Sequence, residues 1–142
     1  MAILATAALL AALATGQPVG PHRVGCNVTE MNGVHIHTRL RIFYRGRPVV
    51  VPADIGIITI AGGTPLCLYW LHTHDDSGLI HVEAPGGSYT LADFFAVWGE
   101  ALSRTRVGSL RGRVVAKVNG VPYKGAPQTI PLIDGERIDL YL

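Results

Sequence analysis

Five of the chain's six histidines stand in two closely spaced groups that could bind a metal ion. The first group is the pair His35 and His37, and the second is the pair His72 and His74 with His81 shortly after it. Successive side chains of a strand point to opposite faces, so each His-x-His pair would project both imidazoles to the same side. Imidazole is the commonest side-chain metal ligand in proteins. The spacing therefore predicts a transition-metal site.

Two carboxylates beside the second group, Asp75 and Glu83, are further candidates as metal ligands or as supports for the imidazoles. A divalent transition metal needs three or four donors at about 2.0–2.2 Å. A set of imidazoles with an optional carboxylate suits copper or zinc, and also iron or nickel, and copper has the highest affinity at a given site. Copper or zinc is therefore the predicted cofactor.

The first pair has a second interpretation, because His35 and His37 share their strand face with Arg39 and Arg41. That composition is typical of a solvated surface, and neighbouring cations disfavour a bound dication. The second group does not fit this interpretation as well, because apolar residues such as Trp70 share its face. We predict the second group as the centre of the site, with the first pair either joining it or forming a solvated surface.

A β-hairpin is expected to position the second group. Residues 66–74 and 79–83 alternate on either side of a dense turn signal. A two-residue loop would place His74 opposite His81, and a four-residue loop would place His72 opposite His81. Both registers gather the three imidazoles on one face, whereas a three-residue loop would turn the second strand over.

The rest of the chain predicts an α+β fold. Val34–Tyr44 alternates as a long strand, and the dipeptide Asn119-Gly120 is a strong hairpin signal. Thr90 and Asp93 resemble a capping box at the start of one principal helix, for which Gly99 is a terminator. These elements predict a mostly antiparallel or mixed β-sheet with one helix. A β-grasp-like arrangement is favoured, and a β-sandwich is the alternative.

Length and composition indicate a single folded domain. The chain has 142 residues, of which 49% are hydrophobic and 15% are charged, as in an ordinary globular protein. We divide it into a signal peptide or N-terminal anchor (1–15), a linker or N-terminal segment (16–33) and one β-rich metal-binding domain (34–142). The formal charge of +2 is too small to indicate a nucleic-acid partner.

The alanine-rich apolar stretch from Ala2 to Thr15 indicates export. It is shorter than the ~20 residues of a membrane helix and matches the apolar region of a signal peptide. A signal peptide normally has a positive charge before its apolar region, and none precedes this stretch. A retained anchor or a buried N-terminal helix would explain the missing charge. Cys26 and Cys67 predict a disulfide in an oxidising compartment, with thiolate ligation of the metal as the alternative. We expect a periplasmic, extracellular or membrane-tethered protein that contacts the membrane only through its N-terminal segment.

Four segments resemble a group of uncharacterised, histidine-rich exported domains of bacteria and archaea. These segments are His35–Leu40, Val51–Gly56, Leu71–Glu83 and Phe94–Gly99. Members of that group have a third histidine two residues after the first pair, where this chain has Arg39. The resemblance implies a shared site and no particular activity.

Three functions are compatible with these observations. The first is exported copper or zinc binding for metal buffering, delivery or sensing, with a metal-delivery protein as a candidate partner. The second is a small metalloenzyme, oxygen-dependent or hydrolytic, with an open metal position beside Asp75, Asp76 or Glu83. The third is a metal-free protein-interaction module whose histidines respond to pH. Non-catalytic metal binding is favoured, because the sequence holds no hydrolase elbow, zincin motif or phosphate loop.

Overall fold

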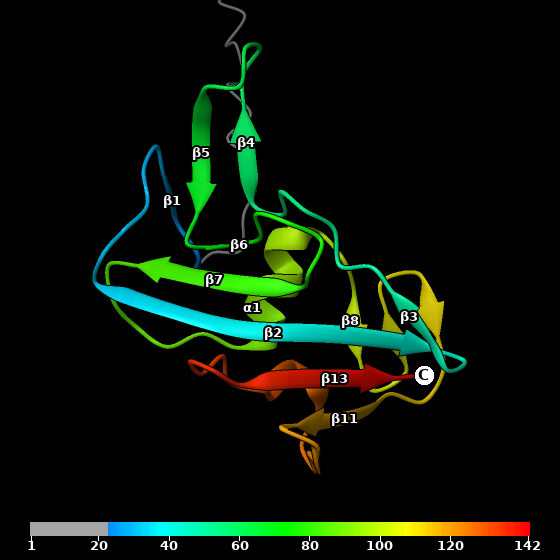
Figure 1. Cartoon of the computed structure of the whole chain (residues 1–142). Coiled ribbons are helices and arrows are strands. Elements are labelled where there is room, and N and C mark those ends of the chain that lie inside the picture. The colour runs from blue at the N-terminus through cyan, green and yellow to red at the C-terminus, as the bar shows by residue number, and fades with distance from the viewer. Residues whose placement is uncertain (1–22) are drawn as a thin grey trace, which may run out of the picture.

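The computed structural model describes residues 23–142, and its main layer is a mixed β-sheet (Figure 1). The leader predicted at 1–15 and the first part of the 16–33 segment lie outside the described residues. Along the sheet the strands are β12 (Val121–Pro122), β11 (Val115–Val118), β13 (Arg137–Tyr141), β2 (Val34–Tyr44), β7 (Leu79–Ala84) and β6 (Leu71–His72), and β3 (Arg47–Val49) also pairs with β2.

The long strand β2 lies between two strands that run in different directions. It pairs in parallel with β13 and antiparallel with β7. Its alternation is confirmed, because Leu40 and Ile42 are buried in the core whereas Arg39 and Arg41 are exposed on the other face. The predicted hairpin at Asn119 is also confirmed, since β11 and β12 pair across it. These strands and one principal helix confirm the α+β class.

The helix α1 (Leu91–Trp98) lies behind the sheet in Figure 1. The carboxylate of Asp93 accepts hydrogen bonds from the backbone N–H of Thr90 at 2.8 Å and from its hydroxyl at 3.1 Å, and Gly99 ends the helix with a φ of 76°. Phe94 and Phe95 of this helix are buried in the hydrophobic core. The core therefore lies on the helix side of the sheet, and the other face carries mostly polar side chains.

Two smaller antiparallel sheets flank the main one. One consists of β1 (Cys26–Asn27), β5 (Pro65–Tyr69) and β4 (Ile57–Thr59), and the other of β8 (Leu102–Ser103), β9 (Arg106–Val107) and β10 (Leu110–Arg111); a 3₁₀ turn covers Pro127–Thr129. A disulfide joins Cys26 of β1 to Cys67 of β5. The predicted disulfide is confirmed, and both cysteines are therefore withdrawn from metal ligation.

The strand predicted over 66–74 is broken at Trp70. Its N–H donates to the carbonyl of Gly25 at 3.0 Å, and its own carbonyl accepts the N–H of Glu83 at 2.7 Å. The chain therefore passes at this residue from the small β1–β5–β4 sheet into the main sheet, where β6 pairs with β7. Among residues 23–142 no helix is long and apolar enough to span a membrane.

Candidate metal centre

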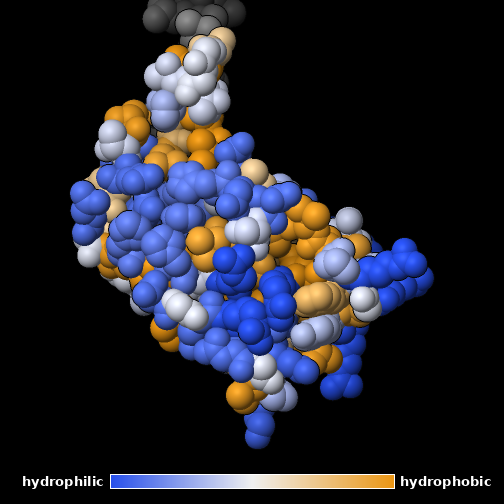
Figure 2. All heavy atoms as spheres, viewed as in Figure 1, coloured by the Kyte–Doolittle hydropathy of each residue, from blue (hydrophilic) through white to orange (hydrophobic). Residues whose placement is uncertain are grey.

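Three neighbouring strands bring the predicted histidines together on the polar face of the main sheet. His81 of β7 pairs directly with His37 of β2 on one side and with His72 of β6 on the other. Two residues further along the same two strands, His35 of β2 pairs with Glu83 of β7. Directly opposed residues present their side chains on the same face, and Figure 2 shows hydrophilic side chains over much of it. The register with His72 opposite His81, one of the two predicted, is confirmed.

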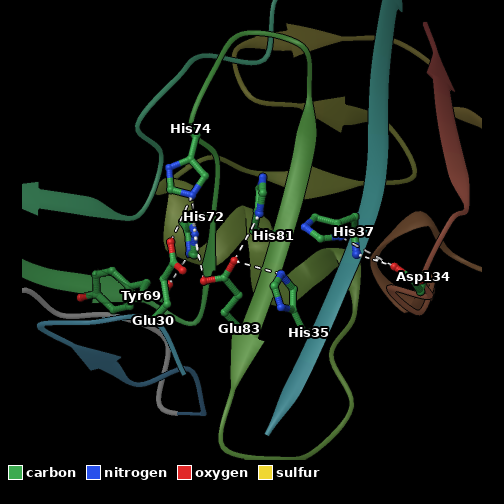
Figure 3. Close-up of polar contacts among 9 residues, drawn as sticks. All are labelled: Glu30, His35, His37, Tyr69, His72, His74, His81, Glu83 and Asp134. Carbon is green, nitrogen blue, oxygen red and sulfur yellow. Dashed lines mark hydrogen bonds and ion pairs between the residues drawn. The ribbon is translucent and has the colours of Figure 1, made fainter. Parts of the chain in front are cut away.

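One group of possible ligands is formed by His72, His74, His81 and Glu83, whose ligand atoms all lie within 4.8 Å of one another (Figure 3). The His72 Nε2 to His74 Nε2 distance is 3.2 Å, and the His72 Nε2 to Glu83 Oε2 distance is 3.8 Å. Two ligands of a tetrahedral zinc ion lie about 3.3 Å apart, given bonds of about 2.0–2.1 Å. These side chains are therefore spaced nearly as ligands of a single ion would be.

His72 is fully buried and its ring orientation is fixed. Its Nδ1 lies 2.8 Å from the carbonyl oxygen of Tyr69. A carbonyl can only accept, so this hydrogen bond places the proton on Nδ1 and leaves the lone pair on Nε2. Nε2 is the atom that faces His74 and Glu83. Metal-binding histidines are commonly held in this way by a backbone carbonyl on the other ring nitrogen.

Glu83 is the buried carboxylate of the cluster, with only 4% of its side chain exposed. Its Oε1 lies 3.3 Å from His81 Nδ1 and 3.5 Å from His35 Nε2. Its Oε2 is buried and has no hydrogen-bond partner among residues 23–142. A buried oxygen without a donor costs free energy, and a bound cation would supply the missing interaction. The donor set therefore fits a transition metal.

The first histidine pair joins this cluster. His35, His37, His81 and Glu83 form a second group whose ligand atoms also lie within 4.8 Å of one another. The ring centroids of His37 and His81 are 4.6 Å apart. His35 and His37 are half-exposed, at 54% and 39% of their side chains. Of the two interpretations of this pair, the structure favours membership of the cluster at its solvent-facing side.

The arginines that share this face form hydrogen bonds with groups outside the histidine cluster. Arg41 binds the carboxylate of Asp139 with two hydrogen bonds, of 2.6 and 2.9 Å. Arg39 donates from Nη1 to the carbonyl of Ser77 at 2.9 Å. Their positive charges are therefore directed partly away from the histidines, which lessens the repulsion expected for a bound cation.

Two carboxylates near the cluster have no counterpart in the sequence prediction. Glu30 Oε1 lies 3.8 Å from His74 Nε2, and Asp134 Oδ1 lies 3.9 Å from His37 Nδ1. Both belong to segments outside the regular strands, where no periodicity signals their position. The predicted candidate Asp75 belongs to neither group, and its carboxylate accepts the backbone N–H of Ser77 at 2.9 Å.

Burial favours the neutral imidazoles that metal binding requires. Desolvation lowers the pKa of His72 below its ordinary value of 6.5. Desolvation also lowers the pKa of His81, and the electrostatic interaction with the neighbouring His74 and His37 acts in the same direction. Because a metal binds the unprotonated ring nitrogen, both side chains are in the binding form at neutral pH.

These pKa shifts predict that the metal-free protein loses stability in mild acid. The unfolded chain binds more protons than the folded chain once the pH falls below 6.5, so the free energy of unfolding decreases there and levels off below the folded pKa values. Urea unfolding with EDTA, between about pH 8 and about pH 5, measures this decrease. The matched variant His72→Asn keeps an N–H for the Tyr69 carbonyl and does not titrate, so it should show a shallower dependence. Identical curves for both proteins would contradict the assignment.

Comparisons with known proteins identify no relative. No protein family, curated protein or solved structure matches this chain.

Proposed function

We propose that this protein is an exported metal-binding protein that holds copper or zinc with His72, His74, His81 and Glu83. The observation that carries the proposal is the buried Glu83 carboxylate, which lies among imidazoles from β2, β6 and β7. Burying a charged carboxylate in that position costs free energy unless a cation is bound beside it, because the charge loses its hydration. Oε1 lies within hydrogen-bond distance of His81 Nδ1, at 3.3 Å, whereas Oε2 has no hydrogen-bond partner among residues 23–142, so a cation beside Oε2 would offset part of that cost.

The strands that carry the histidines allow a metal ion to bind tightly and still exchange with solvent. His72 and His81 are on paired strands, so little conformational entropy is lost when an ion orders them. His74 is 44% exposed and lies at the solvent-facing side of the buried His72, so an ion can enter and leave there. This combination suits buffering or delivery of the ion. The Cys26–Cys67 disulfide is compatible with an oxidising compartment, and hence with export.

Metal titration of the apo protein tests the proposal. Untagged full-length protein is stripped with a chelator and titrated with Cu²⁺ or Zn²⁺ against a chromophoric competitor. The variant His72→Ala/His74→Ala should bind at least about 100-fold more weakly, because it removes two ligands and even outer-shell partners are worth 10–100-fold. The control His22→Ala changes the one histidine that belongs to neither of the two groups predicted from the sequence, and it should bind like the wild type. Equal affinity of the double variant and the wild type would end the proposal.

A further inference from the structure

We infer that the cluster binds two metal ions, one beside each histidine pair, with the Glu83 carboxylate bridging them. This inference rests on the proposed function and adds its stoichiometry. The two ligand groups share His81 and Glu83 and otherwise divide into the pair on β2 and the pair at β6. With Glu83 shared and His81 serving one of the ions, one ion has four ligands and the other has three, which meets the three or four donors that a transition metal needs.

The two oxygens of Glu83 face different pairs. Oε1 lies 3.5 Å from His35 Nε2, whereas Oε2 lies 3.8 Å from His72 Nε2. A carboxylate that bridges two cations gives one oxygen to each, and the ions of two-metal sites are about 3.5–4 Å apart. Bridging would also give Oε2 the partner that it lacks among residues 23–142.

The His81 ring stands between the two pairs. Its centroid is 4.6 Å from the ring of His37 and 4.6 Å from the ring of His74 (Figure 3). One ion next to His74 is therefore separated from His37 by an intervening ring, and a single ion does not use both pairs. His81 has two ring nitrogens and can serve either ion.

Negative charge is distributed to match two cations. Besides the central Glu83, one further carboxylate lies beside each pair, Glu30 near His74 at 3.8 Å and Asp134 near His37 at 3.9 Å. These carboxylates reduce the mutual repulsion of two dications. The inner ion, next to the buried His72, is expected to bind first, and the outer ion on the exposed pair is expected to exchange more readily.

Copper stoichiometry and electron paramagnetic resonance test the inference. Untagged full-length protein is dialysed to equilibrium with Cu²⁺ and its copper is counted by elemental analysis. The wild type should hold two ions whose spins couple, seen as a half-field signal. His35→Ala/His37→Ala should hold one ion with an uncoupled spectrum and an inner-site affinity within a few-fold of the wild type. The control His22→Ala should retain both ions and the coupling.

The possible outcomes separate this inference from the proposed function. One copper in the wild type, lost in His72→Ala/His74→Ala, would overturn the second ion and leave the proposed function standing. Two coppers without a half-field signal would overturn the bridge. Neither copper nor zinc bound by the wild type would overturn both proposals.

Discussion

The Glu83→Gln variant is expected to bind copper or zinc about 100-fold more weakly than the wild type. Glutamine fits the same space and offers an oxygen, but it lacks the negative charge that the cluster holds in a buried position. Competition titration of the apo proteins measures the change. In thermal unfolding with excess metal, a 100-fold loss of affinity corresponds to about 2.7 kcal/mol less stabilisation by the metal.

The metal-free proteins provide the control for this substitution. Without metal, Glu83→Gln should unfold at the same or a slightly higher denaturant concentration, because a buried charge has been removed. Glu30→Gln is the matched exposed variant, since Glu30 is 54% exposed and lies 3.8 Å from His74, and it should weaken binding far less. Equal losses of affinity in the two variants would contradict a special role for Glu83.

Of the substitutions proposed for this protein, removal of the disulfide should lower the free energy of unfolding the most. Cys26 and Cys67 are 41 residues apart in sequence, and closing a loop of that length is expected to stabilise the fold by about 4 kcal/mol through the entropy of the unfolded chain. The double variant Cys26→Ser/Cys67→Ser should lose about this much in urea unfolding. It also places a hydroxyl at the buried position 67, which adds to the loss.

A reducing agent separates the effect of the cross-link from that of the substitutions. Reductant should destabilise the wild type by nearly the same amount and leave the double variant unchanged. A wild type that unfolds at the same urea concentration with and without reductant, once both thiols are shown to be free, would refute this estimate.

Local patterns predict much of the fold. The alternation of Val34–Tyr44 matches β2 residue for residue, because one face of that strand is buried in the core. The capping signals at Thr90 and Gly99 mark the two ends of α1. The His-x-His spacing also predicts which side chains gather in the site, since strand geometry fixes which residues share a face.

Long-range pairing accounts for what the sequence does not predict. No local signal shows that β7 lies between β2 and β6, although this placement brings the first histidine pair into the cluster. The break at Trp70 depends on a backbone hydrogen bond to Gly25, which is distant in sequence. Glu30 and Asp134 lie outside the strands, so their approach to the histidines depends on tertiary packing.

The central place of β7 has a mechanical consequence. Its side chains His81 and Glu83 contact imidazoles from the strands on both sides. Metal ions held there would cross-link the three strands. Separating two neighbouring strands would then require breaking coordination bonds as well as the backbone hydrogen bonds between them. The loaded sheet should therefore open more slowly than the empty one, with slower amide hydrogen exchange along β2, β6 and β7.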